Sequence, residues 1–392
     1  MSGLNFLNKL LDGVDVEWLS LGELGDFIRG NGLQKKDFVE SGFPAIHYGQ
    51  IYTRYGLSAD KTFTYVLPEL ANKLRKAQKN DLLLATTSEN DKDVVKPLAW
   101  LGDNVAISGD MMLFRHEQNV KYLAYFFQSE IFQTQKMKYI TGAKVRRVSS
   151  GDLSKIKIPI PCSNNPEKSL TIQSEIVRIL DRFTALTAEL TAELTMRKNQ
   201  YNYYRDQLLS FDEGEVEWRT LGEITRKIAS GRNKTRQAEG DFPVYGSTGL
   251  LGFTNESAYS GDLLLVARVG AYAGLVNAVS GHFDVSDNTL IIHPSDSWNA
   301  RFAFHQLTHM NLNQYAVGAG QPLITGGMLK NLKVPVPSLN EQTRIAKILD
   351  KFETITVSIT EGLPREIELR QKQYEYYRDL LFSFPKPEIA SY

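Results

Sequence analysis

Two histidines have the spacing that most resembles a metal site. His305 and His309 lie four residues apart, which puts both on one face of a helix. Zinc proteases with this spacing carry a glutamate directly after the first histidine, where this chain has Gln306. The single cysteine, Cys162, excludes an internal disulfide and a zinc site built from several cysteines. We therefore expect no metal site.

Signatures of catalysis and nucleotide binding are also missing. Asn165-Pro166-Glu167 lacks the second proline of the Asn/Asp-Pro-Pro-aromatic motif with which amino-methyltransferases hold a target base. The loop that carries Gly246, Gly249 and Gly252 fits neither the P-loop nor the dinucleotide-binding spacing. The sequence therefore predicts a protein that is not an enzyme and has no cofactor of its own.

Polar and basic side chains instead collect in loops, in both halves of the chain. Arg and Lys suit phosphates and guanine, whereas Asn and Gln suit adenine, so these loops are candidates for DNA contacts. In the first half the candidates are Lys35, Lys36, His47, Tyr48, Gln50, Tyr52, Arg54, Lys144, Arg146 and Arg147. In the second half they are Arg232, Asn233, Lys234, Arg236, Tyr245, Ser247, Thr248, Arg268, Tyr272 and Gln321. Solvated surface loops and simple turns are the alternative explanation.

The charge of the chain is neutral overall but unevenly spread. The totals are 45 Lys/Arg and 45 Asp/Glu. Residues 18–160 hold 20 Lys/Arg against 15 Asp/Glu, a net of +5, and residues 218–335 hold 10 against 8, a net of +2. A protein that alone wrapped DNA tightly would be more basic. If the chain binds DNA, we expect a partner to supply part of the phosphate contacts.

An internal repeat covers nearly the whole chain. Val16-Glu17-Trp18 returns as Val216-Glu217-Trp218, and the segment 157–161 returns as 333–337. Residues 197–211 and 370–384 are identical at 10 of 15 positions. Residues 24–155 and 224–330, by contrast, share only scattered residues. This alternation predicts two variable domains on a symmetric frame; a duplicated structural domain that has drifted is the alternative.

The variable regions mix short β-type runs with glycine-rich turns. Residues 263–266 are expected to form a strand, and 122–137 and 301–315 to form helices. The dipeptide Phe43-Pro44 before Tyr48-Gly49 aligns with Phe242-Pro243 before Tyr245-Gly246. Such regions are typical of mixed α/β domains.

A heptad pattern predicts a long helix from Gln173 to Phe211, with nine of its eleven core positions apolar or aromatic. A second long helix is expected from about Asn340, with a break before Pro364, which would open a new helical segment. Since no third long helix is expected, the two should pair with each other as an antiparallel, coiled-coil-like spacer. Core packing inside one compact fold is the alternative.

A short tandem repeat lies within the first long helix. Its two units are Thr187-Ala188-Glu189-Leu190 and Thr191-Ala192-Glu193-Leu194. Four residues add about 6 Å and slightly more than one turn, so a unit can be gained or lost while the apolar seam nearly keeps its register. We therefore expect this segment to adjust the length of the spacer.

The predicted organisation is α+β, with a pseudo-two-fold internal repeat. Residues 1–160 and 215–337 form the two variable domains, and residues 161–214 and 338–392 carry the spacer helices. The sequence contains no apolar run long enough to span a bilayer and no signal-peptide pattern, so a cytoplasmic protein is expected. A duplicated scaffold that binds proteins, without DNA specificity, is the second candidate function.

The helical segments resemble the specificity subunits of type I restriction-modification enzymes, and in particular their type IC subfamily. The resemblance lies in residues 165–170, 173–194, 200–211 and 362–388, and its layout covers about the whole chain. It implies two target-recognition domains, each binding one half of an asymmetric DNA site, and helices that dock two methyltransferase subunits, with restriction subunits joining them. It also implies that the partner subunits use S-adenosylmethionine, Mg and ATP, and that the number of Thr-Ala-Glu-Leu units sets the gap between half-sites.

Overall fold

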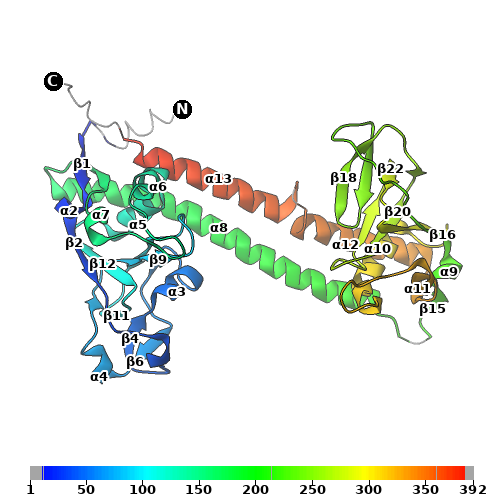
Figure 1. Ribbon diagram of the computed structural model, residues 1–392, viewed down its shortest axis with the longest axis horizontal. Coiled ribbons are helices and arrows are strands. Elements are labelled where there is room, and N and C mark those ends of the chain that lie inside the picture. Colours follow the sequence, from blue (N-terminus) through cyan, green and yellow to red (C-terminus); the bar gives the residue numbers. More distant parts are fainter. Residues whose placement is uncertain (1–10, 12, 213, 359, 385–392) are drawn as a thin grey trace. The chain divides into compact units, whose positions relative to one another are not determined.

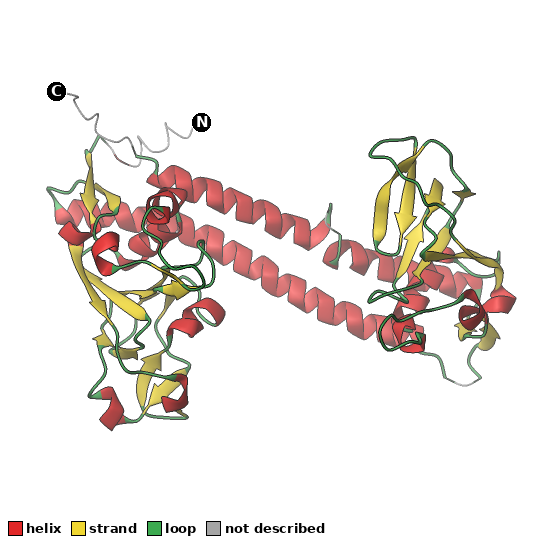
Figure 2. Ribbon diagram, viewed as in Figure 1, coloured by secondary structure: helices red, strands yellow, loops and turns green. Residues whose placement is uncertain are grey.

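The computed structural model describes residues 11, 13–212, 214–358 and 360–384. The chain forms two compact units. The first comprises the described residues up to Glu189 and those from Glu368 onward, and the second comprises Leu190–Ile367. Each unit contains one region of strands and short helices, together with parts of the long helices (Figures 1 and 2). We call these regions head 1 (residues 16–161) and head 2 (residues 217–336).

Head 1 is built on two five-stranded sheets, in the orders β2-β12-β8-β10-β5 and β3-β6-β4-β11-β7, and two small ribbons, β1-β14 and β13-β9. Its strands are β1 (Val16–Ser20), β2 (Gly25–Arg29), β3 (Phe38–Val39), β4 (Phe43–Ile46), β5 (Ser58–Ala59), β6 (Thr64–Val66), β7 (Lys76–Ala77), β8 (Leu82–Ala85), β9 (Thr87–Ser88), β10 (Lys96–Trp100), β11 (Val105–Ile107), β12 (Met111–His116), β13 (Arg146–Arg147) and β14 (Lys157–Pro161).

Head 2 repeats this plan with fewer strands. It has two four-stranded sheets, in the orders β16-β23-β20-β21 and β18-β17-β22-β19, and one ribbon, β15-β24. Its strands are β15 (Glu217–Thr220), β16 (Thr225–Ser230), β17 (Phe242–Gly246), β18 (Gly249–Thr254), β19 (Tyr259–Ser260), β20 (Leu263–Ala267), β21 (Val276–Val279), β22 (His282–Val285), β23 (Thr289–Pro294) and β24 (Lys333–Val336). The strand predicted at residues 263–266 is confirmed as β20.

The helices fall into short ones within the heads and long ones outside them. The short ones are α2 (Leu21–Leu24), η1 (Lys35–Asp37), α3 (Tyr48–Thr53), α4 (Pro68–Ala71), α5 (Val120–Gln128), α6 (Glu130–Met137), α7 (Ser150–Leu153), α9 (Leu221–Ile224), α10 (Ala300–His309), η2 (Leu312–Tyr315) and α11 (Gly326–Lys330). The long ones are α8 (Pro166–Leu209), α12 (Leu339–Thr356) and α13 (Gly362–Phe382).

The repeated sequence at the start of each head forms a strand followed by a capped turn. Ser20 and Thr220 end the first strands, and three residues later Glu23 and Glu223 accept hydrogen bonds from the backbone and hydroxyl of these caps. This capping box ends the strand and starts a single helical turn at the same place in both heads. The repeated Ile/Val-Pro segment then closes each head, because β14 pairs with β1 and β24 pairs with β15.

In the first unit, α8 and α13 run in opposite directions and pack together (Figure 1). The rings of Phe183 and Tyr377 stack with centroids 5.3 Å apart. Leu180, Leu381 and Phe382 are buried in the same core as the aromatic side chains of α5. Head 1 therefore shares one hydrophobic core with this part of the helix pair.

In the second unit, the later part of α8 packs against α12. The rings of Tyr201 and Tyr204 lie 6.1 and 5.7 Å from the ring of Phe352. Leu209, Ile345 and Leu349 are buried in one core with the helix α10 of head 2. The aromatic residues of the repeated Gln-Tyr-x-Tyr-Tyr segment thus supply the apolar seam in both units.

The structure confirms the break predicted before Pro364, since α12 ends at Thr356 and α13 begins at Gly362. Three other predictions need correction. The helix expected over 301–315 ends at His309, because Asn311 has a positive φ of 47°, and the short 3-10 helix η2 follows it. The helix expected over 122–137 is interrupted at Ser129, whose hydroxyl caps the new helix α6 by accepting a hydrogen bond from the Phe132 backbone.

Among the described residues, no helix combines the length and apolar character needed to cross a membrane.

The alignment of Tyr48 with Tyr245 is also wrong. Ile46 pairs with Ile107 at the end of β4, and Tyr245 pairs with Val285 at the end of β17, so Tyr245 is the equivalent of Ile46. Tyr48 instead opens helix α3. The match of tyrosine and glycine in the two sequences does not correspond to a shared position in the fold.

Candidate nucleic-acid interface

In each head, three loops meet at one short segment that connects the two main sheets. In head 1 this segment is residues 108–111. The backbone of Gly30 donates to the carbonyl of Met111 at 2.9 Å, and the backbone of Thr86 donates to the carbonyl of Asp110 at 3.1 Å. The Ser108 hydroxyl accepts a hydrogen bond from the Tyr48 backbone at 3.0 Å. We call this arrangement the loop junction.

Head 2 forms the same loop junction at residues 286–289. The backbones of Gly231 and Arg268 donate to the carbonyls of Thr289 (2.9 Å) and Asn288 (3.0 Å). The Ser247 hydroxyl donates to the carbonyl of Asn288 at 2.9 Å. Loops that are distant in sequence are thereby held side by side in both heads.

Glycine is required where the first loop crosses the junction. A Cβ atom on Gly30 would lie 2.1 Å from the carbonyl oxygen of Ser108, and one on Gly231 would lie 2.2 Å from that of Ser286. Either contact is far inside van der Waals distance. The backbone can approach this closely only without a side chain.

The predicted residues 47–54 divide into structural and exposed groups. His47 is buried and caps α3, its Nδ1 accepting from the Gly49 backbone at 3.2 Å. Gln50 accepts from the His47 backbone at 2.8 Å, and the Tyr52 hydroxyl donates to the carbonyl of Thr87 at 2.9 Å. Burial lowers the pKa of His47 and raises the pKa of Tyr52. These three polar groups are engaged inside head 1, while Arg54 is exposed, over the ring of Phe63.

The other predicted residues of head 1 lie on its surface. Lys35 and Lys36 are exposed in η1, Lys144 is exposed in the loop before β13, and Arg147 is exposed at the end of β13. Arg146 is half-buried, and its Nε lies 2.8 Å from a carboxylate oxygen of Asp91. Because β13 pairs with β9, the loops at 86–93 and 141–147 lie next to each other. Tyr48 is half-buried beside the junction.

In head 2, the first predicted loop is fixed by its asparagine. The Asn233 side chain donates to a carboxylate oxygen of Asp284 at 2.6 Å, whereas Arg232, Lys234 and Arg236 are exposed. The ring of Tyr245 packs edge-on against the ring of Phe283. Tyr245 therefore belongs partly to the core of head 2.

The remaining predicted residues of head 2 come together around the loop after β20. Val269 bridges to Leu323, and the Gly270 backbone donates to the carbonyl of Pro322 at 3.0 Å, which brings Gln321 close to this loop. Tyr272 is 62% exposed, and Gln321 and Thr248 are exposed as well. The Arg268 Nε is buried and has no hydrogen-bond partner.

The sequence interpretation missed the segments that organise these loops. Residues 108–110 and 286–288, Ser-Gly-Asp and Ser-Asp-Asn, directly follow the strands β11 and β22. A polar turn after an apolar strand is the only signal that marks them. It missed residues 88–93 as well, which carry Asp91.

The two histidines of helix α10 contact different carboxylates. His305 Nε2 lies 2.7 Å from Asp350 Oδ1, and His309 Nε2 lies 3.3 Å from Asp206 Oδ1. His305, Asp350 and Glu353 could offer metal ligands within 4.8 Å of one another. However, the Arg301 guanidinium donates to both carboxylates and occupies the place of a cation there.

The protonation states at this cluster follow from burial and charge. Burial lowers the pKa of His305 and outweighs the neighbouring carboxylates, so the imidazole is neutral and donates from Nε2 to Asp350. Burial opposes ionisation of Asp350, but the hydrogen bonds from Arg301 and His305 outweigh it and lower the pKa of this carboxyl group. The cluster is therefore an ion pair of Arg301 with Asp350, supported by a neutral histidine.

The predicted spacer segment lies in the middle of α8. Thr187, Leu190, Glu193 and Leu194 are half-buried, whereas Ala188, Glu189, Thr191 and Ala192 are exposed. The half-buried positions recur every three or four residues, as expected for one face of a helix. The boundary between the two compact units falls between Glu189 and Leu190, inside this segment.

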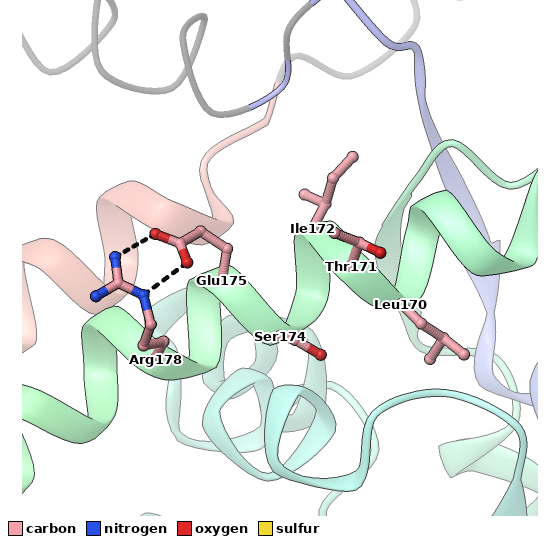
Figure 3. A pocket seen from close by; sticks show the side chains of 6 residues that line it. All are labelled: Leu170, Thr171, Ile172, Ser174, Glu175 and Arg178. Carbon is pink, nitrogen blue, oxygen red and sulfur yellow. Dashed lines mark hydrogen bonds and ion pairs between the residues drawn. The ribbon is translucent and has the colours of Figure 1, made fainter.

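A surface hollow of 620 Å³ lies near the start of α8. Figure 3 shows that Glu175 and Arg178 point toward each other, while Leu170 and Ile172 point to different sides of the helix. The Arg178 Nε donates to Glu175 at 2.7 Å. The residues that line this hollow include none of the predicted DNA-binding side chains.

Known proteins are similar to this chain in sequence and in fold. The family model for the type I restriction modification DNA specificity domain matches residues 13–196 and 213–369. The chain is 40% identical to the EcoR124I/EcoR124II specificity subunit of Escherichia coli, with all of both chains covered. It is 39% identical to the EcoprrI specificity subunit of the same species, over 92% of this chain and 93% of that one.

A solved structure supports the same fold. The S subunit of the type I restriction-modification system from M. genitalium superposes with a TM-score of 0.62 at 17% identity, covering 96% of this chain and 98% of the other. The duplicated arrangement of heads and long helices is thus shared at low sequence identity. The chain belongs to the family of type I restriction-modification DNA-specificity subunits, the non-catalytic components that give these systems their DNA specificity.

Proposed function

We propose that head 1 and head 2 each recognise one half of a bipartite, asymmetric DNA site. The observation that carries this proposal is the loop junction, which holds three loops in the same arrangement in both heads while the exposed side chains on those loops differ. Equal frames with different contact residues suit two different half-sites. The domain limits given from the sequence, 1–160, 161–214, 215–337 and 338–392, describe the units that we assign to recognition and spacing.

The exposed members of the predicted set are the candidates for direct contact. In head 1 these are Lys35, Lys36, Arg54, Lys144 and Arg147, and in head 2 they are Arg232, Lys234, Arg236, Thr248, Tyr272 and Gln321. Cations suit phosphates and guanine, whereas the glutamine amide suits adenine. We assign His47, Gln50, Tyr52, Arg146, Asn233 and Tyr245 chiefly to holding the loops, since their polar groups or rings are already engaged.

The long helices are proposed to dock two methyltransferase subunits and, with them, the restriction subunits. The heads carry a modest positive charge, so these partners would contribute phosphate contacts. S-adenosylmethionine, Mg and ATP belong to the partner subunits in this proposal. Because the target of this assembly would be genomic DNA, we propose that it acts in the bacterial cytoplasm.

The Thr-Ala-Glu-Leu units at 187–194 are proposed to set the gap between the half-sites, as in the type IC subfamily. Deleting residues 191–194 removes about 6 Å of helix and slightly more than one turn. The expected result is a different number of unspecified base pairs between two unchanged half-sites. A changed half-site sequence would contradict this role.

The experiment that tests the function is a binding assay of the full chain with its methyltransferase partner. Sequence-selective, salt-dependent binding is expected, followed by mapping of methylated adenines across the genome. Replacing residues 24–155 with those of a relative should change one half-site and leave the other intact. Absence of sequence selectivity in the complex would reject the proposal.

A further inference from the structure

The two heads dock on the long helices through the same set of acceptor groups. The first acceptor is a glutamine side chain. Gln173 accepts a hydrogen bond from the backbone of Asn119 at 3.0 Å, and Gln342 accepts one from the backbone of Asn299 at 2.8 Å. Both glutamine side chains are fully buried, and each asparagine is the N-cap of the head helix, α5 or α10.

The second acceptor is an aspartate eight residues after each glutamine. Asp181 accepts from Lys121 Nζ at 2.5 Å and from the Tyr125 hydroxyl at 2.7 Å. In the other unit, Asp350 accepts from Arg301 and, at 2.7 Å, from His305. The donors stand at the same two positions of the head helix, four residues apart, but they differ in chemistry.

A third repeated acceptor lies within each head, at the carbonyl of a proline in the last strand before the long helix. Pro159 accepts from the Tyr122 hydroxyl at 2.6 Å, whereas Pro335 accepts from the Gln306 side chain at 2.7 Å. These donors come from different positions of α5 and α10. The acceptors are thus repeated between the two halves, and the donors are not.

The short helix that follows the head helix supports the loop after the central strand of the first sheet. In head 1, α6 directly follows α5, and its buried Lys136 donates to the carbonyls of Lys92 and Val94, each at 3.0 Å. In head 2, η2 follows α10, and the Asn313 side chain donates to the carbonyl of Ala273 at 2.8 Å. These two supported loops contain Asp91, the partner of Arg146, and Tyr272.

A continuous set of contacts therefore joins the long helices to a loop of each candidate DNA surface. It passes from the aspartate to the head helix, along the chain to α6 or η2, and from there to the loop. Charge-assisted hydrogen bonds to carboxylates are shorter and stronger than neutral ones, so they hold the orientation of the head helix. A tilt of the head helix would carry α6 or η2 with it and so move the supported loop.

We propose that Gln173 and Asp181, and their repeats Gln342 and Asp350, form a socket that positions each recognition head on the long helices, while Pro159 and Pro335 hold the head helix within its own head. This inference rests on the function proposed above. Asp181 and Asp350 are then positioning residues for half-site selectivity, and they make no contact with DNA.

The socket accepts chemically different heads because its aspartate acts only as an acceptor, which lysine with tyrosine or arginine with histidine can satisfy. Its glutamine also donates, Gln173 to the side chain of Gln118 and Gln342 to the carbonyl of Ser297.

The test uses the full chain in complex with its methyltransferase partner and a library of randomised DNA sites. In Asp350→Asn the carboxylate charge that holds Arg301 and His305 is lost. We expect discrimination against mismatched bases to fall about tenfold in the half-site bound by head 2, with the other half-site unchanged. Asp181→Asn should produce the mirror result. The matched controls are Glu341→Gln on α12 and Glu175→Gln on α8, each removing an exposed ion pair from the same helices.

A second pair of variants separates positioning from folding. His305→Phe keeps a buried ring but removes the donor to Asp350, whereas His305→Tyr supplies the hydroxyl that head 1 uses at this position. We expect His305→Phe to relax one half-site and His305→Tyr to restore selectivity. If Asp350→Asn fails to fold, this pair decides the question alone.

Three outcomes would overturn the socket. They are unchanged selectivity in every variant, equal relaxation of both half-sites, and His305→Tyr behaving as His305→Phe does. Failure of the proposed function looks different, because the unaltered complex would then show no sequence selectivity at all.

Discussion

Head 1 and head 2 share a frame and differ in what they attach to it. Head 1 has five strands in each main sheet and head 2 has four, yet the core order β2-β12-β8-β10 in one matches β16-β23-β20-β21 in the other. The capping boxes, loop junctions and sockets occur in both. The shared frame therefore consists of backbone hydrogen bonds and of the glutamine and aspartate side chains on the long helices. The side chains on the loops differ between the two heads.

The largest expected effect concerns a repeated core position that is filled differently in the two units. Phe382 is fully buried against the rings of Tyr122 and Phe126, whereas its repeat, Leu209, is 5% exposed. Phe382→Ala should lower the free energy of unfolding of the first unit by about 3–5 kcal/mol, and Leu209→Ala should cost the second unit about 2–3 kcal/mol. Hydrogen exchange resolved by peptide would measure each unit. Leu369→Ala, at an exposed site, serves as the control, and equal losses in both units would show that the two cores are equivalent.

The second prediction concerns His116 of head 1, a position at which head 2 has Pro294. Burial lowers the pKa of His116 to about 4, its Nδ1 accepts from the Gln118 backbone, and its Nε2 is buried without a partner. The unfolded chain takes up a proton near pH 6.5 and head 1 does so only near pH 4. The stability due to the neutral imidazole is therefore complete above pH 6.5 and is lost as the pH falls toward 4, up to about 3 kcal/mol.

His116→Asn keeps an acceptor for the Gln118 backbone and removes the titration. As the pH falls from 7 to 4, the unfolding free energy of the original chain should decrease more than that of the variant. The difference between the two free energies should therefore change in favour of the variant. A difference that stays constant over this range would contradict the assignment.

Third, the loop junctions should respond alike in the two heads. Gly30→Ala and Gly231→Ala each drive a Cβ atom into a backbone carbonyl, which should destabilise the affected head by about 1–3 kcal/mol. Gly320→Ala is the control, because a Cβ atom there meets nothing within 4 Å. Local hydrogen exchange and binding to the corresponding half-site are the measurements. A strong effect in only one head would show that the junctions are not equivalent.

The smallest effect is expected from single exposed cations. Arg147→Ala should weaken DNA binding by a similar factor for all sequences and reduce the slope of log K against log salt by about 1. Arg146→Ala should leave that slope nearly unchanged, since Asp91 already pairs with this side chain. DNA titrations of the complex at several salt concentrations distinguish the two residues. Equal slopes for both variants would contradict the assignment of Arg147 to DNA contact and of Arg146 to holding the loop.

Much of the architecture could be predicted from the sequence because its signals are local or repeated. The heptad pattern predicted α8, and Pro364 predicted the break between α12 and α13, because helical periodicity and the missing amide of proline act within one or two turns. The helix expected over 122–137 was wrong in one respect. Ser129 can serve as either a helical residue or a cap, and only the packing around it decides which.

The candidate site was predictable only in part. Polar loops stood out by composition, but composition does not distinguish Arg147, which is exposed, from Arg146, which Asp91 holds. The mistaken alignment of Tyr48 with Tyr245 has the same origin. A tyrosine before a glycine looks alike in two sequences, whereas strand register, set by β11 and β22 far along the chain, determines which residue occupies the position.

Amino-acid sequence by itself determined the duplication, the long amphipathic helices and the division into repeated and divergent segments, because each follows from the order of residues along the chain. Tertiary structure alone decided the loop junctions and the sockets. Their hydrogen bonds join residues that lie roughly 20 to 80 positions apart, such as Tyr125 with Asp181 and Gly30 with Met111. No local pattern marks such partners, since their distance depends on how sheets and helices pack.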